Sequence, residues 1–257
     1  MAEPLGALLA RTRRAGARLA AYPERAPVDL VEGYRVQDDM AEAMGRPVIG
    51  WKIGLTSHAA QEAMGVGEPI CGPLFDGLVH ASPAHLVVSA DDLRVLEAEI
   101  AVRMARDLPR TDAPVSREDV TAAIATVHPA FELATKRLPG TIRESAPWIA
   151  ADGAVNQHLV LGEGIDWRPD LDLAKEPVEV DAGDTTVATG IGANALGDPL
   201  AVVTWLANHL HERGRTLRAG DIVSTGLLTE MIVAAFGTPY TARFANLGTV
   251  TVQLDQA

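Results

Sequence analysis

Two glutamates interrupt an apolar run in the middle of the chain, where residues 95–104 have the sequence Val-Leu-Glu-Ala-Glu-Ile-Ala-Val-Arg-Met. Apolar side chains at every second position, from Leu96 to Val102, predict a strand with one face toward a core. Glu97 and Glu99 would then stand side by side on the other face. Two carboxylates so close repel one another unless one is protonated or a cation lies between them. The spacing alone also fits an exposed strand face or a helix with two surface glutamates, and these simpler interpretations are the better supported by it.

Periodicity along the rest of the chain predicts a mixed fold. Helices are expected at about 3–21, 28–44, 58–64, 116–127 and 199–213, and further strands at about 48–56, 86–89, 178–180, 186–188, 221–225 and 248–254. Asp198 and Pro199 fit the start of the last helix, and Gly214 fits its end. Because strands dominate, we predict an α+β fold around a curved or barrel-like mixed sheet. We divide it into an N-terminal helical segment, 1–46, and one continuous catalytic unit, 47–257.

A third glutamate, Glu132, follows the helix predicted at 116–127. Ser116 can cap this helix, and Pro129 would end it, because the residue before a proline disfavours helical backbone. Glu132 lies among apolar residues, and a buried carboxylate needs a partner or a metal. A salt bridge to Arg137 or to another nearby basic residue is the simpler explanation of this glutamate taken alone.

A lysine flanked by glycines marks the strand predicted at 48–56. On a strand, Lys52 shares its face with Gly50 and Gly54, which would leave empty space around its ammonium group. Such a cationic floor suits a small anion. A solvent-exposed lysine, with glycines that help the strand twist, explains the segment equally well.

Composition excludes several classes of partner. A net charge of −12 argues against nucleic acid and anionic membranes, although a single local cation can still bind a small anionic substrate. Cys71 is the one cysteine, so there is no intramolecular disulfide and no cysteine-based zinc site. No apolar run approaches membrane-spanning length. Residues 1–22 lack a convincing cleavage site, so we expect them to form a helix of the mature protein, in the cytoplasm.

The three signals together suggest one site, although spacing cannot show that they meet in space. Three carboxylates suit a hard divalent cation, Mg²⁺ or Mn²⁺, with water in the remaining positions. Such a cation can chelate the carboxylate and 2-oxo oxygens of a 2-oxo acid and stabilise an enolate. Lys52 would bind the substrate carboxylate or move a proton.

The same segments resemble the fumarylacetoacetate hydrolase superfamily, in its branch of 2-oxopent-4-enoate hydratases and 4-oxalocrotonate decarboxylases. The segments that carry the resemblance lie in order from about residue 30 to the end, at 50–57, 97–101, 129–132, 151–154, 197–200, 205–208, 219–223 and 247–248. Each motif alone is modest, but their common order is hard to obtain by chance.

The resemblance implies a mixed β-roll core and a metal site of the type Glu-x-Glu plus a distant glutamate. By position, the metal ligands are Glu97, Glu99 and Glu132, the active-site lysine is Lys52, and the substrate-binding residues are Leu55, Ser57, Ile70, Thr225 and Gly226. Members of this branch act on 2-hydroxydienoates or 2-oxo acids from aromatic catabolism, and they usually form homo-oligomers. Its hydratases and decarboxylases also associate with one another, so a complex of that kind is expected as well.

The chain departs from the hydratase pattern at one informative position. Hydratases of the branch tend to carry an aspartate where this chain has Ile70, an aspartate thought to help deliver water or a proton. Decarboxylases tend to have an apolar residue there. The usual Ala-Asp-Asn has also become Ala-Asp-Gly at 151–153, and the pair before Arg137 has changed.

Four functions are compatible with the family resemblance. We expect a hydro-lyase that adds water to 2-hydroxypenta-2,4-dienoate or a close relative, giving a 4-hydroxy-2-oxo acid. Decarboxylation of 2-oxo-3-hexenedioate is the alternative, and Ile70 is its main support. Hydrolysis of a C–C bond in an acylpyruvate would need a His–Glu pair, which the sequence does not reveal. A non-catalytic partner subunit is disfavoured by the intact glutamates and Lys52.

Overall fold

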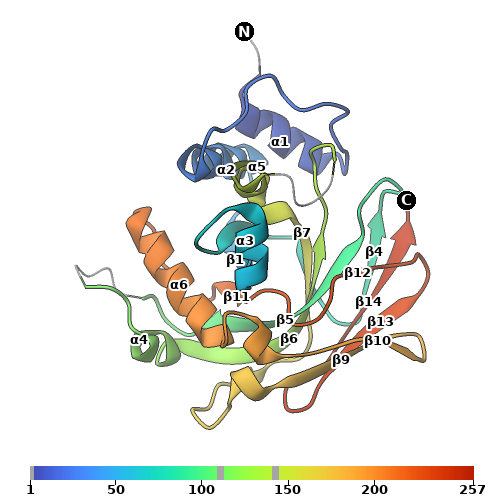
Figure 1. Cartoon of the computed structure of the whole chain (residues 1–257). Coiled ribbons are helices and arrows are strands. Elements are labelled where there is room, and N and C mark those ends of the chain that lie inside the picture. Colours follow the sequence, from blue (N-terminus) through green and yellow to red (C-terminus); the bar gives the residue numbers. More distant parts are fainter. Residues whose placement is uncertain (1–2, 109–112, 141–144) are drawn as a thin grey trace.

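The strand predicted at 95–104 is present as β5 (Val95–Met104) and runs through the larger of two β-sheets. The computed structural model describes residues 3–108, 113–140 and 145–257. Figure 1 shows α1, α2 and α5 together at the N-terminal end of the molecule, α4 and α6 at the left and the smaller sheet at the right. This arrangement leaves β5 and its neighbours in the middle of the molecule.

The larger sheet has nine strands in the order β2-β1-β11-β5-β6-β7-β3, with β12 beside β5 and β8 beside β6. Besides β5, these are β1 (Val48–Gly54), β2 (Ile70–Phe75), β3 (Val79–Ala81), β6 (Ile124–Ala134), β7 (Asn156–Leu161), β8 (Ile165–Asp166), β11 (Ile222–Ser224) and β12 (Ile232–Val233). The pairing of β1 with β11 is parallel and that of β5 with β6 is antiparallel, so the sheet is mixed.

The smaller sheet has five strands in the order β10-β9-β13-β14-β4. They are β4 (Ala84–Val88), β9 (Pro177–Ala182), β10 (Thr185–Ile191), β13 (Pro239–Phe244) and β14 (Gly248–Gln256). The antiparallel pair β9–β10 contains the strands expected at 178–180 and 186–188.

The helices are short and mostly capped. They are α1 (Leu5–Arg14), α2 (Leu30–Met44), α3 (His58–Met64), α4 (Arg117–Thr121), α5 (Ala146–Ala151) and α6 (Pro199–Glu212), with 3-10 turns η1 (Gly153–Val155), η2 (Leu173–Lys175) and η3 (Gly192–Asn194). The Asp198 carboxylate accepts from the Leu200 N–H at the start of α6, as its sequence predicts. None of the helices in the described ranges is long and apolar enough to span a membrane.

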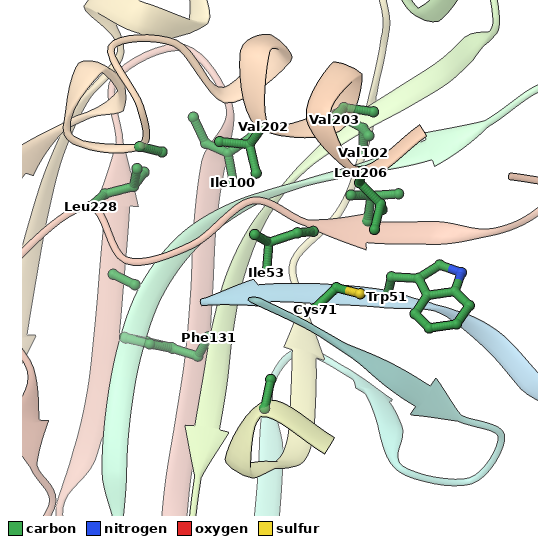
Figure 2. Packing of buried hydrophobic residues seen from close by; sticks show 14 of the residues in the cluster. Trp51, Ile53, Cys71, Ile100, Val102, Phe131, Val202, Val203, Leu206 and Leu228 are labelled. Atoms are coloured by element: carbon green, nitrogen blue, oxygen red, sulfur yellow. The ribbon is translucent and has the colours of Figure 1, made fainter. Parts of the chain in front are cut away.

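Helix α6 covers the apolar face of β5. In Figure 2 its Val202, Val203 and Leu206 gather against Ile100 and Val102, and all five side chains are buried. Because alternate residues of a strand point to opposite faces, this packing turns Glu97 and Glu99 away from α6, toward the other face of the sheet.

Two helical predictions are wrong in extent. The first helix ends at Arg14, not near residue 21. The helix expected at 116–127 ends at Thr121, and Ile124 instead begins β6. The capping box at Ser116 does form, but the β-branched residues that follow pair with β5, as Val127 does with Val102. A partner strand outweighs helical spacing here.

This correction changes the setting of Glu132. It lies within β6 rather than after a helix, and Pro129 is tolerated in the same strand. The Pro129 carbonyl still accepts a hydrogen bond from the Gly162 N–H, at 2.8 Å. The predicted α+β architecture with a curled mixed sheet is confirmed. The boundary between 1–46 and 47–257 stays a prediction.

Candidate metal centre and active site

Five adjacent strands of the larger sheet each place a polar side chain on the same face. In strand order these are Lys52 on β1, Ser224 on β11, Glu97 and Glu99 on β5, Glu132 on β6 and Asn156 on β7. The register explains their meeting, because Lys52 pairs with Ser224 and Glu97 pairs with Glu132. Cross-strand partners point to the same face of a sheet. The three segments singled out in the sequence therefore converge.

The three glutamates form a buried cluster. One carboxylate oxygen from each of Glu97, Glu99 and Glu132 lies within 4.8 Å of the other two. Glu99 and Glu132 are 0% exposed and Glu97 is 9% exposed. Burial, together with the Glu132 charge, raises the pKa of Glu97 to about 7 and the pKa of Glu99 well above its ordinary value. Without a metal ion between them, the three buried carboxylates therefore repel one another.

Glu99 is held at one oxygen and open at the other. Its Oε2 accepts from the Ser224 hydroxyl at 2.5 Å and from the Gly226 N–H at 2.9 Å. Its Oε1 is buried and has no hydrogen-bond partner among the described residues. A buried oxygen left unpaired while its twin is fixed is the arrangement expected of a metal ligand.

Lys52 and Asn156 hold Glu132 from two sides. The Asn156 amide donates to Glu132 Oε1 at 3.0 Å, and Lys52 Nζ lies 2.8 Å from Glu132 Oε2. The lysine approaches Oε2 as an ion pair rather than as a well-directed hydrogen bond. Burial lowers the pKa of Lys52, but the three carboxylates outweigh burial and raise its pKa above the ordinary value. Lys52 is therefore a cation, and Nζ also donates to the Ala154 carbonyl at 3.1 Å.

This donor set fits a hard divalent cation. The buried oxygens come from carboxylates alone, which is the ligand type that Mg²⁺ and Mn²⁺ prefer. With Lys52 present, the three carboxylates carry a net charge close to what a divalent ion would neutralise. Glu97, Glu99 through Oε1, and Glu132 are the residues that could hold it.

A cavity of about 360 Å³ opens onto this cluster. Lys52 and Glu97 lie in its wall, and the rest of the wall is mostly apolar or neutral. The other lining residues are Gly54, Leu55, Thr56, Ser57, Ala60, Met64, Ile70, Ile149, Ala154, Val155, Asn194, Leu227, Thr229 and Met231. The cavity therefore suits a small molecule whose charged end meets Lys52 and whose other end is apolar.

The expected substrate residues fall into two groups. Leu55, Ser57 and Ile70 line the cavity. Thr225 and Gly226 are buried behind it, where Thr225 bonds to the Ile100 carbonyl and Gly226 to Glu99.

The glycines beside Lys52 act differently from each other. A Cβ on Gly54 would lie 3.5 Å from Lys52 Nζ, so this glycine gives the ammonium room, as expected. A Cβ on Gly50 would lie 2.0 Å from the Ile222 carbonyl oxygen, so the space at Gly50 is filled by the β11 backbone. The expectation of empty space at Gly50 is wrong because a neighbouring strand approaches there.

Sequence reasoning missed Ser224 and Asn156. Ser224 directly precedes Thr225, which the family resemblance did indicate, but nothing in the sequence assigned a role to the Ser224 hydroxyl. Nothing in the sequence marked Asn156. Simple alternation from Leu159, which pairs with Glu132, would put residue 157 on this face, but a register shift in β6–β7 pairs Asn156 with Ala134 instead.

Cys71 is a packing residue. It is buried in the main core, and burial raises the pKa of its thiol to about 11. Neither it nor any histidine lines the cavity within the described ranges.

The family follows from the whole chain. The family model described as fumarylacetoacetate (FAA) hydrolase C-terminal matches residues 54–255, so this protein belongs to the fumarylacetoacetate hydrolase family. It is 34% identical over 232 residues to the TodF product hydratase of Pseudomonas putida, across 89% of this chain and 85% of that protein. It is 31% identical to the 2-keto-4-pentenoate hydratase of Paraburkholderia phymatum, across 99% of this chain and 97% of that one.

Solved structures give the same architecture. The 4-oxalocrotonate decarboxylase from Pseudomonas putida G7, complexed with magnesium and adipate, superposes with a TM-score of 0.85 at 27% identity, across 99% of this chain and 98% of that one. The same enzyme complexed with calcium and acetate has a TM-score of 0.83 at 28% identity, with equal coverage. The relatives thus include both reaction types that the sequence left open.

Proposed function

We propose that this protein is a divalent-metal-dependent hydro-lyase that adds water to 2-hydroxypenta-2,4-dienoate or a close relative. The product would be the 4-hydroxy-2-oxo acid. The observation that carries the proposal is the row of Glu97, Glu99 and Glu132 beside Lys52, at the end of a cavity with otherwise uncharged walls. The similarity to enzymes named as 2-keto-4-pentenoate hydratases supports the same reaction.

The three glutamates would hold Mg²⁺, or Mn²⁺, which favours the same oxygen ligands. When bound, the ion supplies a Lewis acid that polarises the 2-oxo oxygen and stabilises negative charge developing there. Lys52 and Glu97 are the charged residues of the described cavity lining, so the substrate would bind with its 2-oxo acid head at these two side chains.

Lys52 would bind the substrate carboxylate. An ammonium group has three N–H donors, and two of them face Glu132 Oε2 and the Ala154 carbonyl. Lys52 also helps to form the cavity wall, so its remaining donor would serve the substrate. Because Lys52 is protonated, its alternative role would be to donate the proton that the reaction adds to the substrate.

The small number of charged residues in the cavity wall favours a substrate with one carboxylate. Within the described ranges, Lys52 is the only cationic residue of the cavity lining, and Glu132 already shares its charge. The proposed dienoate has one carboxylate and a short hydrocarbon tail, which Ile70, Leu227 and Met231 can contact. A second carboxylate in this cavity would be buried without a second cationic partner among the described lining residues.

Decarboxylation of 2-oxo-3-hexenedioate is the second candidate. Ile70 is 0% exposed and lies in the cavity wall, where an apolar residue discourages water. The likeness to the solved 4-oxalocrotonate decarboxylase supports this alternative too. Both reactions would use the same glutamates and the same lysine.

The remaining functions have less support. Acylpyruvate hydrolysis by a His–Glu pair lacks a histidine in the described cavity lining. A purely structural role in a partner complex would give no reason for three glutamates to lie buried and close together.

Two substrates separate the candidates. Protein loaded with Mg²⁺ is incubated with enzymatically generated 2-hydroxypenta-2,4-dienoate and, separately, with 2-oxo-3-hexenedioate, and products are followed by NMR. Formation of 4-hydroxy-2-oxopentanoate from the first supports the hydratase. Carbon dioxide release from the second, without hydration of the first, makes the protein a decarboxylase. No turnover of either removes both assignments.

We further propose that the enzyme acts in the cytoplasm, in aromatic catabolism, as a homo-oligomer, and that it can associate with a related decarboxylase or hydratase. The family resemblance motivates the last two points. Light scattering of the purified protein, alone and mixed with such a relative, tests them, and a monomeric mass in both samples would refute them.

A further inference from the structure

Arg13, on the N-terminal helix α1, reaches the back of the candidate metal centre. Its side chain is 3% exposed, and its guanidinium carbon lies 5.2 Å from the centre of the Phe75 ring. Its Nη2 donates to Asn156 Oδ1 at 3.0 Å. Its Nε and Nη1 are buried and have no hydrogen-bond partner among the described residues.

This burial is unusual because no described carboxylate lies within ion-pair distance of Arg13. Arg137 is buried nearby but fully partnered, with Nε 2.7 Å from Asp152 Oδ1 and Nη2 donating to the Asp152 carbonyl. A buried cation without a paired carboxylate costs stability. Arg13 is therefore better explained by what it does to Asn156 than by a contribution to folding.

Asn156 connects Arg13 to Glu132. The amide accepts from Arg13 at Oδ1 and donates to Glu132 Oε1 through Nδ2, both at 3.0 Å. A cation at Oδ1 leaves the amide one favourable orientation, with its N–H groups toward the carboxylate. It also polarises the amide and so strengthens the hydrogen bond to Glu132.

The fold leaves space for this contact. Gly153 has φ +65°, and a Cβ there would lie 3.0 Å from Arg13 Nη1 and 3.1 Å from the Met40 methyl carbon. The Asn156 amide is thus the hydrogen-bond donor that holds Glu132, at Oε1, while Oε2 faces Lys52 as an ion pair. The plane of this carboxylate is set by the shell behind it, which is how outer hydrogen bonds orient metal ligands.

We propose that Arg13 is a positioning residue that orients the ligand Glu132 through Asn156, so that helix α1 is part of the active site. The proposal rests on the metal site of the proposed function.

The test is a double-mutant cycle on Mn²⁺ affinity, measured by calorimetry on the metal-free full chain. We expect Arg13→Met to weaken Mn²⁺ binding about tenfold and Asn156→Ala to weaken it at least as much. The double variant should be no weaker than Asn156→Ala alone, since the two losses share one cause. Arg13→Lys, which keeps a donor for Asn156 Oδ1, should retain most of the wild-type Mn²⁺ affinity.

Arg14→Met is the matched control. Arg14 is the next residue on α1, is exposed, and donates to the Ala43 carbonyl away from the site. Its Mn²⁺ affinity should equal that of the wild type. Thermal unfolding of each metal-free variant accompanies the titrations, and the losses of affinity should not follow the order of the melting temperatures. Arg13→Gln, too short to reach Asn156, replaces Arg13→Met if that variant does not fold.

Three results overturn the inference. The first is unchanged or tighter Mn²⁺ binding by Arg13→Met, which would make Arg13 a packing residue or a repelling charge. The second is additive loss in the double variant, which would separate Arg13 from Asn156. The third is a wild-type protein that binds no Mn²⁺. This result would refute the proposed metal site itself, and it is seen with the wild type alone, before any variant is compared.

Discussion

Glu97 and Glu132 are direct cross-strand partners on β5 and β6, both almost wholly withdrawn from solvent. Like charges opposite one another destabilise a sheet, and burial increases the cost. Lys52, 2.8 Å from Glu132, relieves only part of this repulsion. The pairing is understandable as a site prepared for a second cation, and its consequences can be measured.

Removing the open ligand should separate metal affinity from stability. Glu99 Oε1 has no described partner, and burial raises the pKa of this carboxyl. We expect Glu99→Gln to weaken Mg²⁺ binding by about 100-fold or more, because loss of an outer-shell partner alone costs up to about 100-fold. The metal-free variant should be as stable as the wild type or more stable. Calorimetry and thermal unfolding check this. Glu118→Gln, an exposed change on α4, should alter neither property.

Replacing Lys52 should lower the stability of the protein without weakening metal binding, which is the opposite of the effect of Glu99→Gln. Lys52→Met removes the only described cation that faces the three carboxylates, and breaking a buried pair costs about 3 kcal/mol or more of unfolding free energy. Metal affinity should not fall, because the metal then meets more negative charge, but turnover should be lost. Urea unfolding, titration and the dienoate assay test these points. The exposed Lys175→Met is the control, and weaker metal binding by Lys52→Met would contradict the assigned role.

The metal-free protein should lose stability from Glu97 as the pH rises. Burial raises the folded-state pKa of Glu97 to about 7, above the ordinary value of 4.5. Its stabilising contribution is therefore complete below about pH 4.5 and is lost as the pH rises through about 7. Relative to Glu97→Gln, the wild type should become progressively less stable across this range, in urea unfolding with a chelator present.

Comparing the wild type with Glu97→Gln at each pH removes the contribution of the histidines to the pH dependence of stability. Burial lowers the pKa of His158 to about 3 and of His209 to about 4, so their contributions are lost as the pH falls below about 6.5. Both histidines are present in wild type and variant. A difference that stays constant with pH would show that Glu97 is charged throughout. In the presence of Mg²⁺ the wild type should instead gain stability with pH, because protons and metal compete.

A second cation in the cavity wall should admit a dicarboxylate. Met231 is half-buried and lines the cavity. We expect Met231→Lys to bind adipate at least tenfold more tightly than the wild type, which follows from adding one charge-assisted hydrogen bond. Met231→Gln, of similar length but uncharged, is the control. Tight adipate binding by the wild type would show instead that a dicarboxylate is already accommodated.

Gly226 should be more sensitive than other left-handed glycines. It has φ +96°, and a Cβ there would lie 2.3 Å from Thr56 Oγ1, beside the N–H that bonds to Glu99. Gly237 has φ +71° with nothing near its Cβ. Gly237→Ala should cost about 1 kcal/mol of unfolding free energy from backbone strain alone. Gly226→Ala should cost more unfolding free energy than Gly237→Ala. Of the two changes, it is the one that should weaken Mg²⁺ binding. Equal effects would deny the contact with Glu99 a functional role.

Local sequence determined the elements whose signals are short-range. Strand 95–104 with Glu97 and Glu99 on one face, and the capped helix that begins after Asp198, could be predicted from alternation and capping. The ordered motifs also indicated the family, and with it the three glutamates and Lys52. These features depend on neighbours within a few residues or on a pattern along the chain.

Tertiary structure decided what depends on strand partners. Glu132 was expected after a helix and lies in β6, because pairing with β5 outweighs the helical spacing of residues 116–127. Asn156 reaches the site through a register shift, and Arg13 reaches Asn156 from a helix more than a hundred residues away in sequence. Register and long-range packing are set by which strands and helices meet. No local periodicity reports them, so the proposed ligands could be named from the sequence, while Asn156 and Arg13 behind them could not.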